Sequence, residues 1–436
     1  MSATAPRLRV LDLRDPAAAD HRTWQAMCRR SAGLDGEADR AARTILADVR
    51  ERGDAALLEH TARLEGRHLR AGDLEIDAAT RRAAAARVEP ALRDALALAA
   101  ANVRAFHETQ APRDTGLDGP AIHLRSRVTP LRRVAVYAPG GTAAYPSSVL
   151  HAGIPAKVAG VDEVILLTPR PSDVVLLAAE LAGVDRVFQV GGAQAIAAVA
   201  HGTATLPRVD KIVGPGNAYV TAAKRQVFGL CDIDGIAGPS EILVLADAAA
   251  DPELCAADLL AQAEHDRLAC AVLVTDAPAL AGPVLAALDR QLADLPRREI
   301  AAAALEDHGA LVLVADRPAM IAAADAYAPE HLELLVDDPE PLVPHLRSAG
   351  AIFVGAHTPE AAGDYTAGPS HVLPTAGAAR FASPLGVWDF VKYTSVLRLG
   401  PAALAAQTRA IVDLARAEGL EAHARAALLR RDRGPR

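Results

Sequence analysis

The stretch "VAVYAPGGTAAYPSSVLHAGIPAKVAGVDEVILLT", residues 134–168, decides the fold. Two short runs rich in Val, Ile and Leu flank a Gly/Pro-rich loop and an Ala-rich segment of helical character. This order of strand, loop, helix and strand is typical of a parallel α/β unit. Two further runs, "VFQV" at 187–190 and "KIV" at 211–213, are followed by the same kind of loop and helix. The stretch therefore predicts one half of an α/β protein.

A second series of strands follows, and it predicts a second parallel sheet. Its runs are "ILVLA", "CAVLVT", "ALVLV", "ELLV" and "AIFVG", which begin at residues 242, 270, 310, 333 and 351. Residues before about 110 read as helical, since Ala38, Ala42, Ile45 and Val49 recur at helical spacing, and the chain reads as helical again after Ser395. The predicted fold class is α/β, with two incomplete Rossmann-like domains.

Composition bounds the function. A chain of 436 residues with 51% hydrophobic and 23% charged residues predicts a globular protein of two or more domains. The 46 basic and 54 acidic residues give a net charge of −8 without a long basic block, which argues against a nucleic-acid partner. The four cysteines form no C-x-x-C pair, and no apolar signal or membrane-spanning run is present in the sequence. We expect a cytoplasmic protein with no membrane association.

Three Gly-rich stretches follow predicted strands of the first series. They are "YAPGGTAAYPSSV" from Tyr137, "QVGGAQAIAA" from Gln189 and "VGPGNAYVTAAKR" from Val213, and none contains G-x-G-x-x-G. A loop of this kind can expose backbone N–H groups to a phosphate, although a single one is more often a plain turn. Three at the carboxyl edge of one sheet favour a nucleotide site. Tyr137, Gln194 and Asn217 are the side chains best placed to contact the cofactor.

A metal site without thiolates is the second hypothesis. "LLAQAEHDRL" places Gln262 and His265 three apart in a helical context, which can equally be a plain polar face. Asp364 and His371 follow in a Gly/Pro-rich loop, and Glu418 and His423 in a C-terminal helical segment. Imidazole with carboxylate and carboxamide oxygens suits zinc. The groups are distant in sequence, so spacing alone leaves their convergence open.

The stretch "AYAPEHLELL", Ala326 to Leu335, sets Glu330 directly beside His331. One reading is a turn with two solvated polar side chains, which is the commoner situation for such a pair. The other is a pair of proton-transfer groups at the start of a strand, because an imidazole is a general base near neutral pH and a carboxylate can serve beside it.

Together these motifs resemble the histidinol dehydrogenase family in order and spacing. The resemblance runs from about Arg40 to the C-terminal helix and rests on "YAPGGTAAYPSSVL", "VGGAQAIAA", "VGPGNAYVTAAK", "GIAGPSEILVLAD", "AQAEHD", "APEHLEL", "GDYTAGPSHVLPT" and "ARFASPLGVWDFVK". It implies two incomplete Rossmann-like domains with small terminal elements in an intertwined homodimer. It also implies a four-electron oxidation of L-histidinol through L-histidinal to L-histidine, with NAD and one Zn²⁺ per subunit.

The resemblance also implies roles for individual residues. Glu330 and His331 match the catalytic pair. The implied zinc ligands, which also bind substrate, are Gln262, His265, Asp364 and, from the partner subunit, His423. The implied substrate contacts are Ser240, His331, Glu360, His371 and Glu418, and the implied cofactor contacts are Tyr137, Gln194 and Asn217.

We expect four parts of the chain. Residues 1–30 form an N-terminal arm, 31–132 with 241–375 form a discontinuous first Rossmann-like domain, 133–240 form a second, NAD-binding domain, and 376–436 form a C-terminal helical dimerisation element. Two alternatives for function stay open: a related zinc and NAD dehydrogenase for another small polar alcohol or diol, and a metal-free α/β binding protein that keeps only the scaffold.

Overall fold

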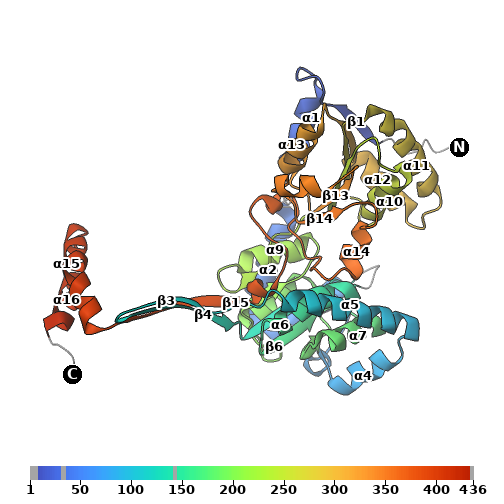
Figure 1. Cartoon of the computed structure of the whole chain (residues 1–436). Helices are drawn as coiled ribbons and strands as arrows, with labels where there is room; N and C mark the ends of the chain where they lie inside the picture. The colour runs from blue at the N-terminus through green and yellow to red at the C-terminus, as the bar shows by residue number, and fades with distance from the viewer. Residues whose placement is uncertain (1–7, 31–35, 141–144, 433–436) are drawn as a thin grey trace.

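The computed structural model describes residues 8–30, 36–140 and 145–432. Two α/β units lie one above the other, and a long narrow arm projects from them and carries the C-terminal helices (Figure 1). Part of the first Gly-rich stretch, residues 141–144, lies outside the described residues, as do residues 1–7, 31–35 and 433–436 of the expected terminal and linking segments.

The first unit is built on a six-stranded sheet in which every pair of neighbours is parallel. In spatial order its strands are β1 (Arg9–Asp12), β12 (Ala310–Leu313), β11 (Cys270–Thr275), β10 (Glu241–Ala246), β13 (His331–Leu335) and β14 (Ala351–Val354). Successive side chains of a strand point to opposite faces. Accordingly Ile242 and Val244 of β10 join one core cluster and Leu243 and Leu245 the other.

Helices cover both faces of this sheet. One core cluster includes side chains from α10 (Pro252–Ala263), α11 (Ala281–Ala293) and α12 (Arg298–His308). The other includes side chains from α1 (Asp20–Cys28) and α13 (Arg317–Tyr327). The remaining short elements of this part of the chain are η2 (Pro278–Leu280), η3 (Glu340–His345) and α14 (Glu360–Tyr365).

The second unit has the same layered plan. Its sheet is parallel except for the antiparallel edge strand β2, and its order is β2 (Glu75–Ile76), β7 (Arg186–Phe188), β6 (Glu163–Leu167), β5 (Arg133–Tyr137), β8 (Lys211–Val213) and β9 (Asp232–Ile233). One face packs against α2 (Gly36–Arg52), α3 (Asp54–Glu65), α8 (Gly192–His201) and α9 (Ala218–Val227). The other packs against α4 (Ala78–Ala86), α5 (Pro90–Glu108), α6 (Pro146–Val158) and α7 (Asp173–Ala182), and η1 (Ala71–Asp73) precedes β2.

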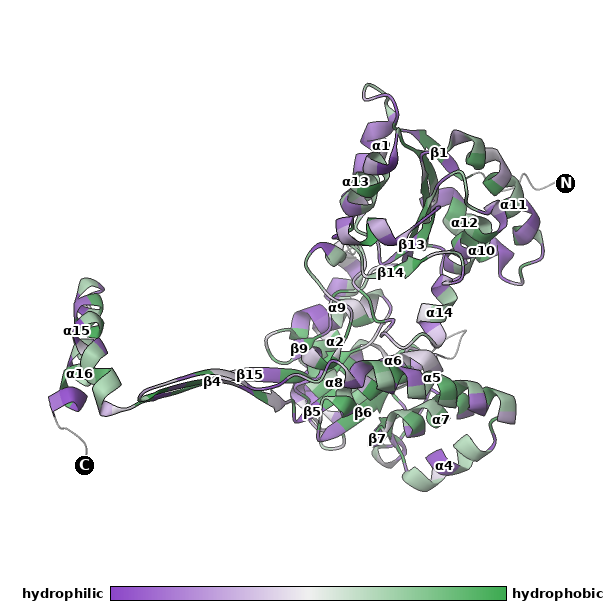
Figure 2. Cartoon of the chain, in the orientation of Figure 1, coloured by the Kyte–Doolittle hydropathy of each residue, from purple (hydrophilic) through white to green (hydrophobic). Residues whose placement is uncertain are grey.

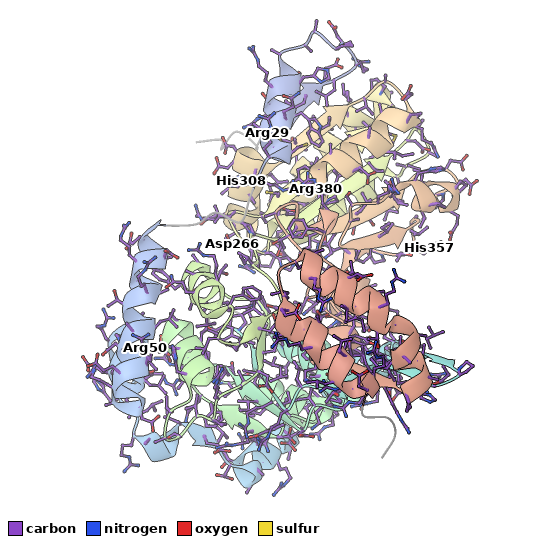
Figure 3. All side chains as sticks on the ribbon, turned by 90° about the vertical axis from the view of Figure 1, so that its left-hand side faces the viewer. Arg29, Arg50, Asp266, His308, His357 and Arg380 are labelled. Carbon is purple, nitrogen blue, oxygen red and sulfur yellow. The ribbon has the colours of Figure 1, made fainter. Side chains whose placement is uncertain are left out.

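The arm is a three-stranded antiparallel ribbon in which β4 (Ile122–Pro130) pairs with β3 (Thr115–Gly119) on one side and β15 (Val391–Leu399) on the other. Two further short helices, η4 (Ala378–Arg380) and η5 (Val387–Phe390), precede β15. The ribbon leads to α15 (Pro401–Ala417) and α16 (Glu421–Asp432), which pack on each other through Val412, Ala415 and Ala424. Viewed from that side, this helix pair is nearest to the viewer (Figure 3).

The predicted fold class is confirmed, with two layered α/β units built on parallel sheets. Hydrophobic colour is concentrated in the sheets, whereas much of the hydrophilic colour lies on the surrounding helices (Figure 2). The helical reading of the early chain is confirmed for α2 and α3, and Ala38, Ala42, Ile45 and Val49 of α2 are buried as expected. None of the helices among the described residues is long and apolar enough to cross a membrane.

The packing corrects three of the expected groupings. Helices α2 to α5 pack on the second unit and not with residues 241–375, because their apolar stripes fit α6 to α9. The expected N-terminal arm adds strand β1 to the first sheet, where Arg9 to Asp12 pair with β12. The expected C-terminal helical element contains a strand, because Val391 to Leu399 pair with β4, so the helical reading after Ser395 is wrong up to Leu399.

Candidate active site

Glu330 and His331 lie at the point where β13 begins. Helix α13 ends at Tyr327 and is capped by Ala328, whose φ of 51° is in the left-handed region, and Pro329 then leads into Glu330. The side chains are not solvated, because Glu330 and His331 are only 6% and 4% exposed. The reading of this pair as an exposed turn is therefore wrong.

A single residue, Glu241, contacts both members of this pair through its main chain. Its N–H donates to Glu330 Oε2 over 2.9 Å, and its carbonyl oxygen lies 3.0 Å from His331 Nδ1. A carbonyl oxygen can only accept, so the proton of the neutral ring is on Nδ1 and the lone pair is on Nε2. The imidazole is thus held in the tautomer that lets Nε2 accept a proton.

Burial shifts the pKa values of the two groups in opposite directions, because it disfavours the charged form of each. It raises the pKa of Glu330 well above the ordinary carboxyl range, although the hydrogen bond from the Glu241 N–H opposes the rise. It lowers the pKa of His331 to about 4. His331 is therefore neutral near pH 7 and able to act as a base.

Gln262 and Glu360 pack behind His331. Gln262 is fully buried on α10, and with its carboxamide nitrogen toward Glu360 it donates to Oε1 of that residue over 2.6 Å. Glu360 begins α14, and its Oε1 lies 3.4 Å from His331 Nδ1. Burial raises the pKa of Glu360 well above its ordinary value. Its Oε2 is buried without a hydrogen-bond partner among the described residues.

Two of the four expected zinc ligands, His265 and Asp364, approach each other within this chain, and Gln262 precedes His265 by three residues. Gln262 is in the last turn of α10. The helix ends at Ala263, so His265 lies outside it, and the prediction that both side chains project from one helical face is only partly correct. Asp364 lies in α14 and not in a loop, and its Oδ2 is 3.7 Å from His265 Nε2. Within the described ranges no three His, Cys, Asp or Glu side chains form a group able to hold a metal.

The donor types nevertheless suit zinc, since a carboxamide, an imidazole and a carboxylate are present without a thiolate. The fourth expected ligand, His423, is exposed on α16 at the far end of the arm (Figure 1). Glu418 is also exposed there, as the residue that caps α15. The two are on different helices, because the chain turns at Gly419 with φ 76°, and this chain does not bring either to the site.

His371 joins the two units. Its Nδ1 lies 3.0 Å from the Asp364 carbonyl oxygen, so Nδ1 carries the proton and Nε2 is left for another partner. Its backbone N–H donates to Nδ1 of His151, which belongs to α6 of the second unit, over 3.1 Å. Burial lowers the pKa of His371. Ser240 lies immediately before β10 and is partly buried.

The three expected cofactor residues lie at the carboxyl edge of the second sheet. Tyr137 ends β5, and its hydroxyl accepts from the Gly192 N–H over 3.1 Å. Gln194 donates to Glu65, and its Oε1 is buried without a partner among the described residues. Asn217 is exposed and caps α9 by accepting from Tyr219 and Val220. An unsatisfied amide oxygen beside Gly-rich turns fits a bound dinucleotide.

Sequence reasoning missed three residues of the site. Glu241 had a signal, because it is the charged first residue of an otherwise apolar strand. His151 had a weaker one, as an imidazole in a helix that is otherwise almost wholly small and apolar. Arg30, which forms an ion pair with Glu241, had none, since it is one of several arginines in its segment.

The chain is similar in sequence and in structure to known proteins. The family model described as histidinol dehydrogenase matches residues 28–431. A histidinol dehydrogenase from Rhizobium meliloti (strain 1021) is 52% identical over 397 residues, which is 90% of this chain and 92% of that protein. One from Cupriavidus pinatubonensis (strain JMP 134 / LMG 1197) is 50% identical over 432 residues, or 96% of each. The crystal structure of histidinol dehydrogenase from Elizabethkingia anophelis matches with a TM-score of 0.91 at 33% identity, covering 97% of this chain and 98% of the other.

Proposed function

The chain belongs to the histidinol dehydrogenase family, and on that premise we propose that it oxidises L-histidinol through L-histidinal to L-histidine with NAD as the electron acceptor. This makes it an oxidoreductase of histidine biosynthesis. The reaction removes four electrons in two steps, first from the alcohol and then from the hydrated aldehyde. Both steps need a base at the reacting carbon, because each forms a carbonyl from a C–OH group.

The observation that carries the proposal is the pairing of Glu330 and His331 by the main chain of Glu241. His331 presents an unprotonated Nε2, which can take the hydroxyl proton as the alcohol becomes an aldehyde. The aldehyde must add water before it can be oxidised again. Glu330 can take a proton from that water, and a carboxylate whose pKa is raised by burial is a stronger acceptor once it is ionised.

The metal ligands in this proposal are Gln262, His265 and Asp364 of one chain with His423 of another. When bound, zinc would supply coordination positions for the imidazole and amine of the substrate. Gln262 would contribute its carboxamide oxygen, because its nitrogen is occupied by Glu360. The substrate contacts would come from Ser240, His371, Glu360 and Glu418. The Glu360 carboxyl is largely buried, and the contacts of its Oε1 with Gln262 and His331 also hold those two side chains in place.

The cofactor would lie along the Gly-rich turns after β5, β7 and β8, next to Tyr137, Gln194 and Asn217. When bound, NAD supplies the hydride acceptor. The arm supports a homodimer with shared sites, since Glu418 and His423 are exposed at its tip and distant from the other site residues of their own chain (Figure 1). We propose the cytoplasm as its location, where NAD and reduced thiols coexist.

The test is a stoichiometric assay. Purified protein, NAD and limiting L-histidinol should give two NADH for each substrate molecule consumed, with L-histidine as the product. The absorbance of the reduced nicotinamide measures the NADH. One NADH per substrate would restrict the activity to an alcohol oxidation. No NADH with histidinol but turnover of other small alcohols or diols would support the alternative dehydrogenase instead.

A further inference from the structure

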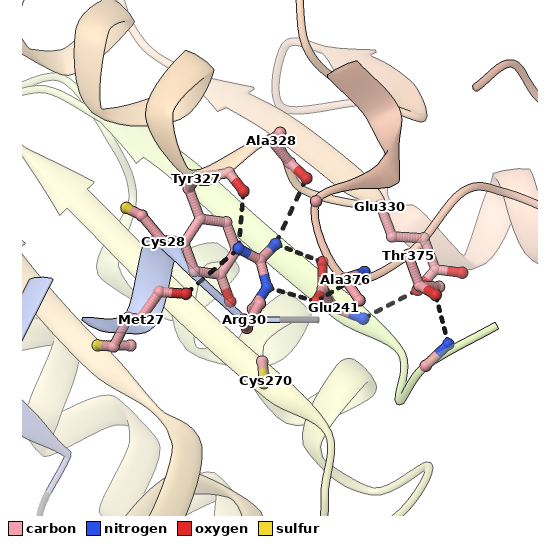
Figure 4. A network of polar contacts seen from close by, with 12 residues as sticks. Met27, Cys28, Arg30, Glu241, Cys270, Tyr327, Ala328, Glu330, Thr375 and Ala376 are labelled. Carbon is pink, nitrogen blue, oxygen red and sulfur yellow. Dashed lines mark hydrogen bonds and ion pairs between the residues drawn. The ribbon is translucent and has the colours of Figure 1, made fainter. Parts of the chain in front are cut away.

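Arg30 lies beneath the catalytic pair, two residues after the end of α1. Its Nε and Nη2 donate to the two carboxylate oxygens of Glu241 over 2.5 and 2.6 Å (Figure 4). This is the two-pronged pairing that a guanidinium makes with a carboxylate and that a lysine cannot reproduce. The ion pair is largely buried, because the side chains of Arg30 and Glu241 are 15% and 2% exposed.

The same guanidinium also contacts the end of α13. Its Nη1 donates to the Tyr327 carbonyl oxygen over 2.7 Å, and its Nη2 lies 3.4 Å from that of Ala328. The guanidinium carbon lies 3.4 Å from the centre of the Tyr327 ring, which stacks in turn on Trp24. Ala328 is the left-handed residue from which the chain turns into Pro329 and Glu330. Arg30 therefore holds the turn that aims Glu330.

Arg30 thus connects the starts of two neighbouring strands. On one side it fixes Glu241, the first residue of β10, whose main chain binds Glu330 and His331. On the other it contacts the carbonyl groups of Tyr327 and Ala328, three and two residues before Glu330. Glu241 Oε1 also accepts from the backbone N–H of Ala376, in the segment that follows His371 (Figure 4). One buried cation therefore sets the relative positions of three backbone segments around the site.

We propose that Arg30, acting through Glu241 and the Ala328 turn, is a positioning residue for Glu330 and His331. Arg30 itself touches neither side chain, so its effect is exerted on their geometry. The inference deepens the proposed function and rests on it. A displacement of about 1 Å at reacting groups can reduce a rate about 100-fold without changing which groups are present. Loss of Arg30 should therefore appear in turnover and not in substrate affinity.

The test compares Arg30→Lys and Arg30→Met with Arg29→Met. Arg29 is the adjacent, exposed arginine at the end of α1 (Figure 3), so its replacement removes the same charge without the contacts to Glu241. Expressed per folded protein, kcat should fall about 10- to 100-fold in both Arg30 variants, with KM for L-histidinol changed by less than about threefold. Arg30→Lys should retain more activity than Arg30→Met. Arg29→Met should match the wild type.

A double-mutant cycle tests whether the effect passes through Glu241. Glu241→Gln keeps the main chain that binds the pair but loses the charge, and Arg30→Met/Glu241→Gln avoids leaving a buried unpaired ion. The kcat of the double variant should be no lower than that of the less active single variant. If Arg30→Met alone folds poorly, the double variant can still be compared with Glu241→Gln. The positioning role would be overturned if the kcat losses of the two single variants multiplied in the double variant. It would also be overturned if the Arg30 variants kept the wild-type kcat, with or without a raised KM. A wild-type protein inactive on L-histidinol would instead contradict the proposed function.

Discussion

The imidazole rings of His151 and His371 lie stacked, with 4.2 Å between their centres and 18° between their planes. The His371 backbone N–H donates to His151 Nδ1, so the proton of His151 is on Nε2, which is buried without a partner among the described residues. Burial lowers the pKa of His151 well below its ordinary value. A neutral histidine of the second unit thus fixes His371, the proposed substrate contact that follows α14 of the first unit.

Replacing His151 by Phe should keep the stacking and remove the acceptor. The His371 N–H would be left buried and unsatisfied, which costs about 1–3 kcal/mol. We expect a lower unfolding temperature and a KM for L-histidinol raised about tenfold, the equivalent of about 1.4 kcal/mol. Thermal unfolding and initial rates would measure both. A variant that loses stability with an unchanged KM would limit His151 to a structural role.

The division of labour between Glu330 and His331 predicts unequal effects on the two half-reactions. Glu330→Gln should retain much of the oxidation of histidinol and lose about 100- to 10,000-fold in the oxidation of histidinal, because only the second needs activated water. His331→Asn should be impaired in both. Stopped assays on each half-reaction would resolve them. Equal losses in Glu330→Gln would show that the carboxyl only supports its neighbour.

Sharing of the site predicts complementation between inactive chains. His265→Asn and His423→Asn should each be inactive alone, since each removes a ligand from every site. In a mixed dimer one of the two sites regains all four ligands, so equal mixing should restore about a quarter of the wild-type activity. Subunit exchange would be verified by mass spectrometry with one labelled chain. No recovery despite exchange would place the complete ligand set within a single chain.

Removal of the metal should weaken substrate binding as well as turnover. The substrate offers an imidazole and an amine, which are good zinc ligands. Calorimetric titration of L-histidinol onto chelator-treated protein should show an affinity reduced at least about tenfold. Re-addition of zinc should restore it. Undiminished affinity without metal would restrict the ion to a structural role.

Glu333 predicts a dependence of stability on pH. It lies two residues after His331 on β13, 1% exposed, and burial followed by the neighbouring Asp258 raises its pKa above the ordinary 4.5. Asp258 of α10 and Glu360 of α14 are the charged groups that face it. The folded protein keeps a proton that the unfolded chain releases above about pH 4.5, so stability falls as pH rises from there toward the folded pKa.

The corresponding measurement is urea unfolding at pH 6 and 8. Wild-type protein should lose up to about 1.4 kcal/mol per pH unit from this proton. Glu333→Gln keeps the shape of the protonated acid, so its loss should be smaller. Glu306→Gln, on the exposed side of α12, provides the control. An identical pH dependence in all three proteins would show that Glu333 does not hold the proton.

The layered units were predictable because their strands are apolar runs of the length expected for buried parallel strands. Strand β3 was not, since "TGLDG" has three exposed positions beyond its two glycines and no apolar alternation. The packing of α2 to α5 could not be predicted either. An apolar stripe indicates that one face of a helix is buried, but it does not indicate which sheet covers that face. The pair Glu330 and His331 could be identified from the sequence. The contacts of Glu241 with that pair could not, because they are made by its backbone N–H and carbonyl groups, which do not depend on the side chain.

Strand β4 is paired in the finished molecule with a segment made much later in synthesis. Roughly 260 residues separate Pro130 from its partner Val391, and at about 5–20 residues per second the ribosome needs roughly 15–50 s to make them. During that time one edge of the β3–β4 hairpin stays open to other nascent chains, the condition in which strands aggregate. Arg125 and Arg127 are both exposed on β4, and Arg125 forms an ion pair with Asp118 of β3. Charged side chains on an open strand edge oppose its pairing with other chains, so these two arginines are the features of β4 suited to that interval.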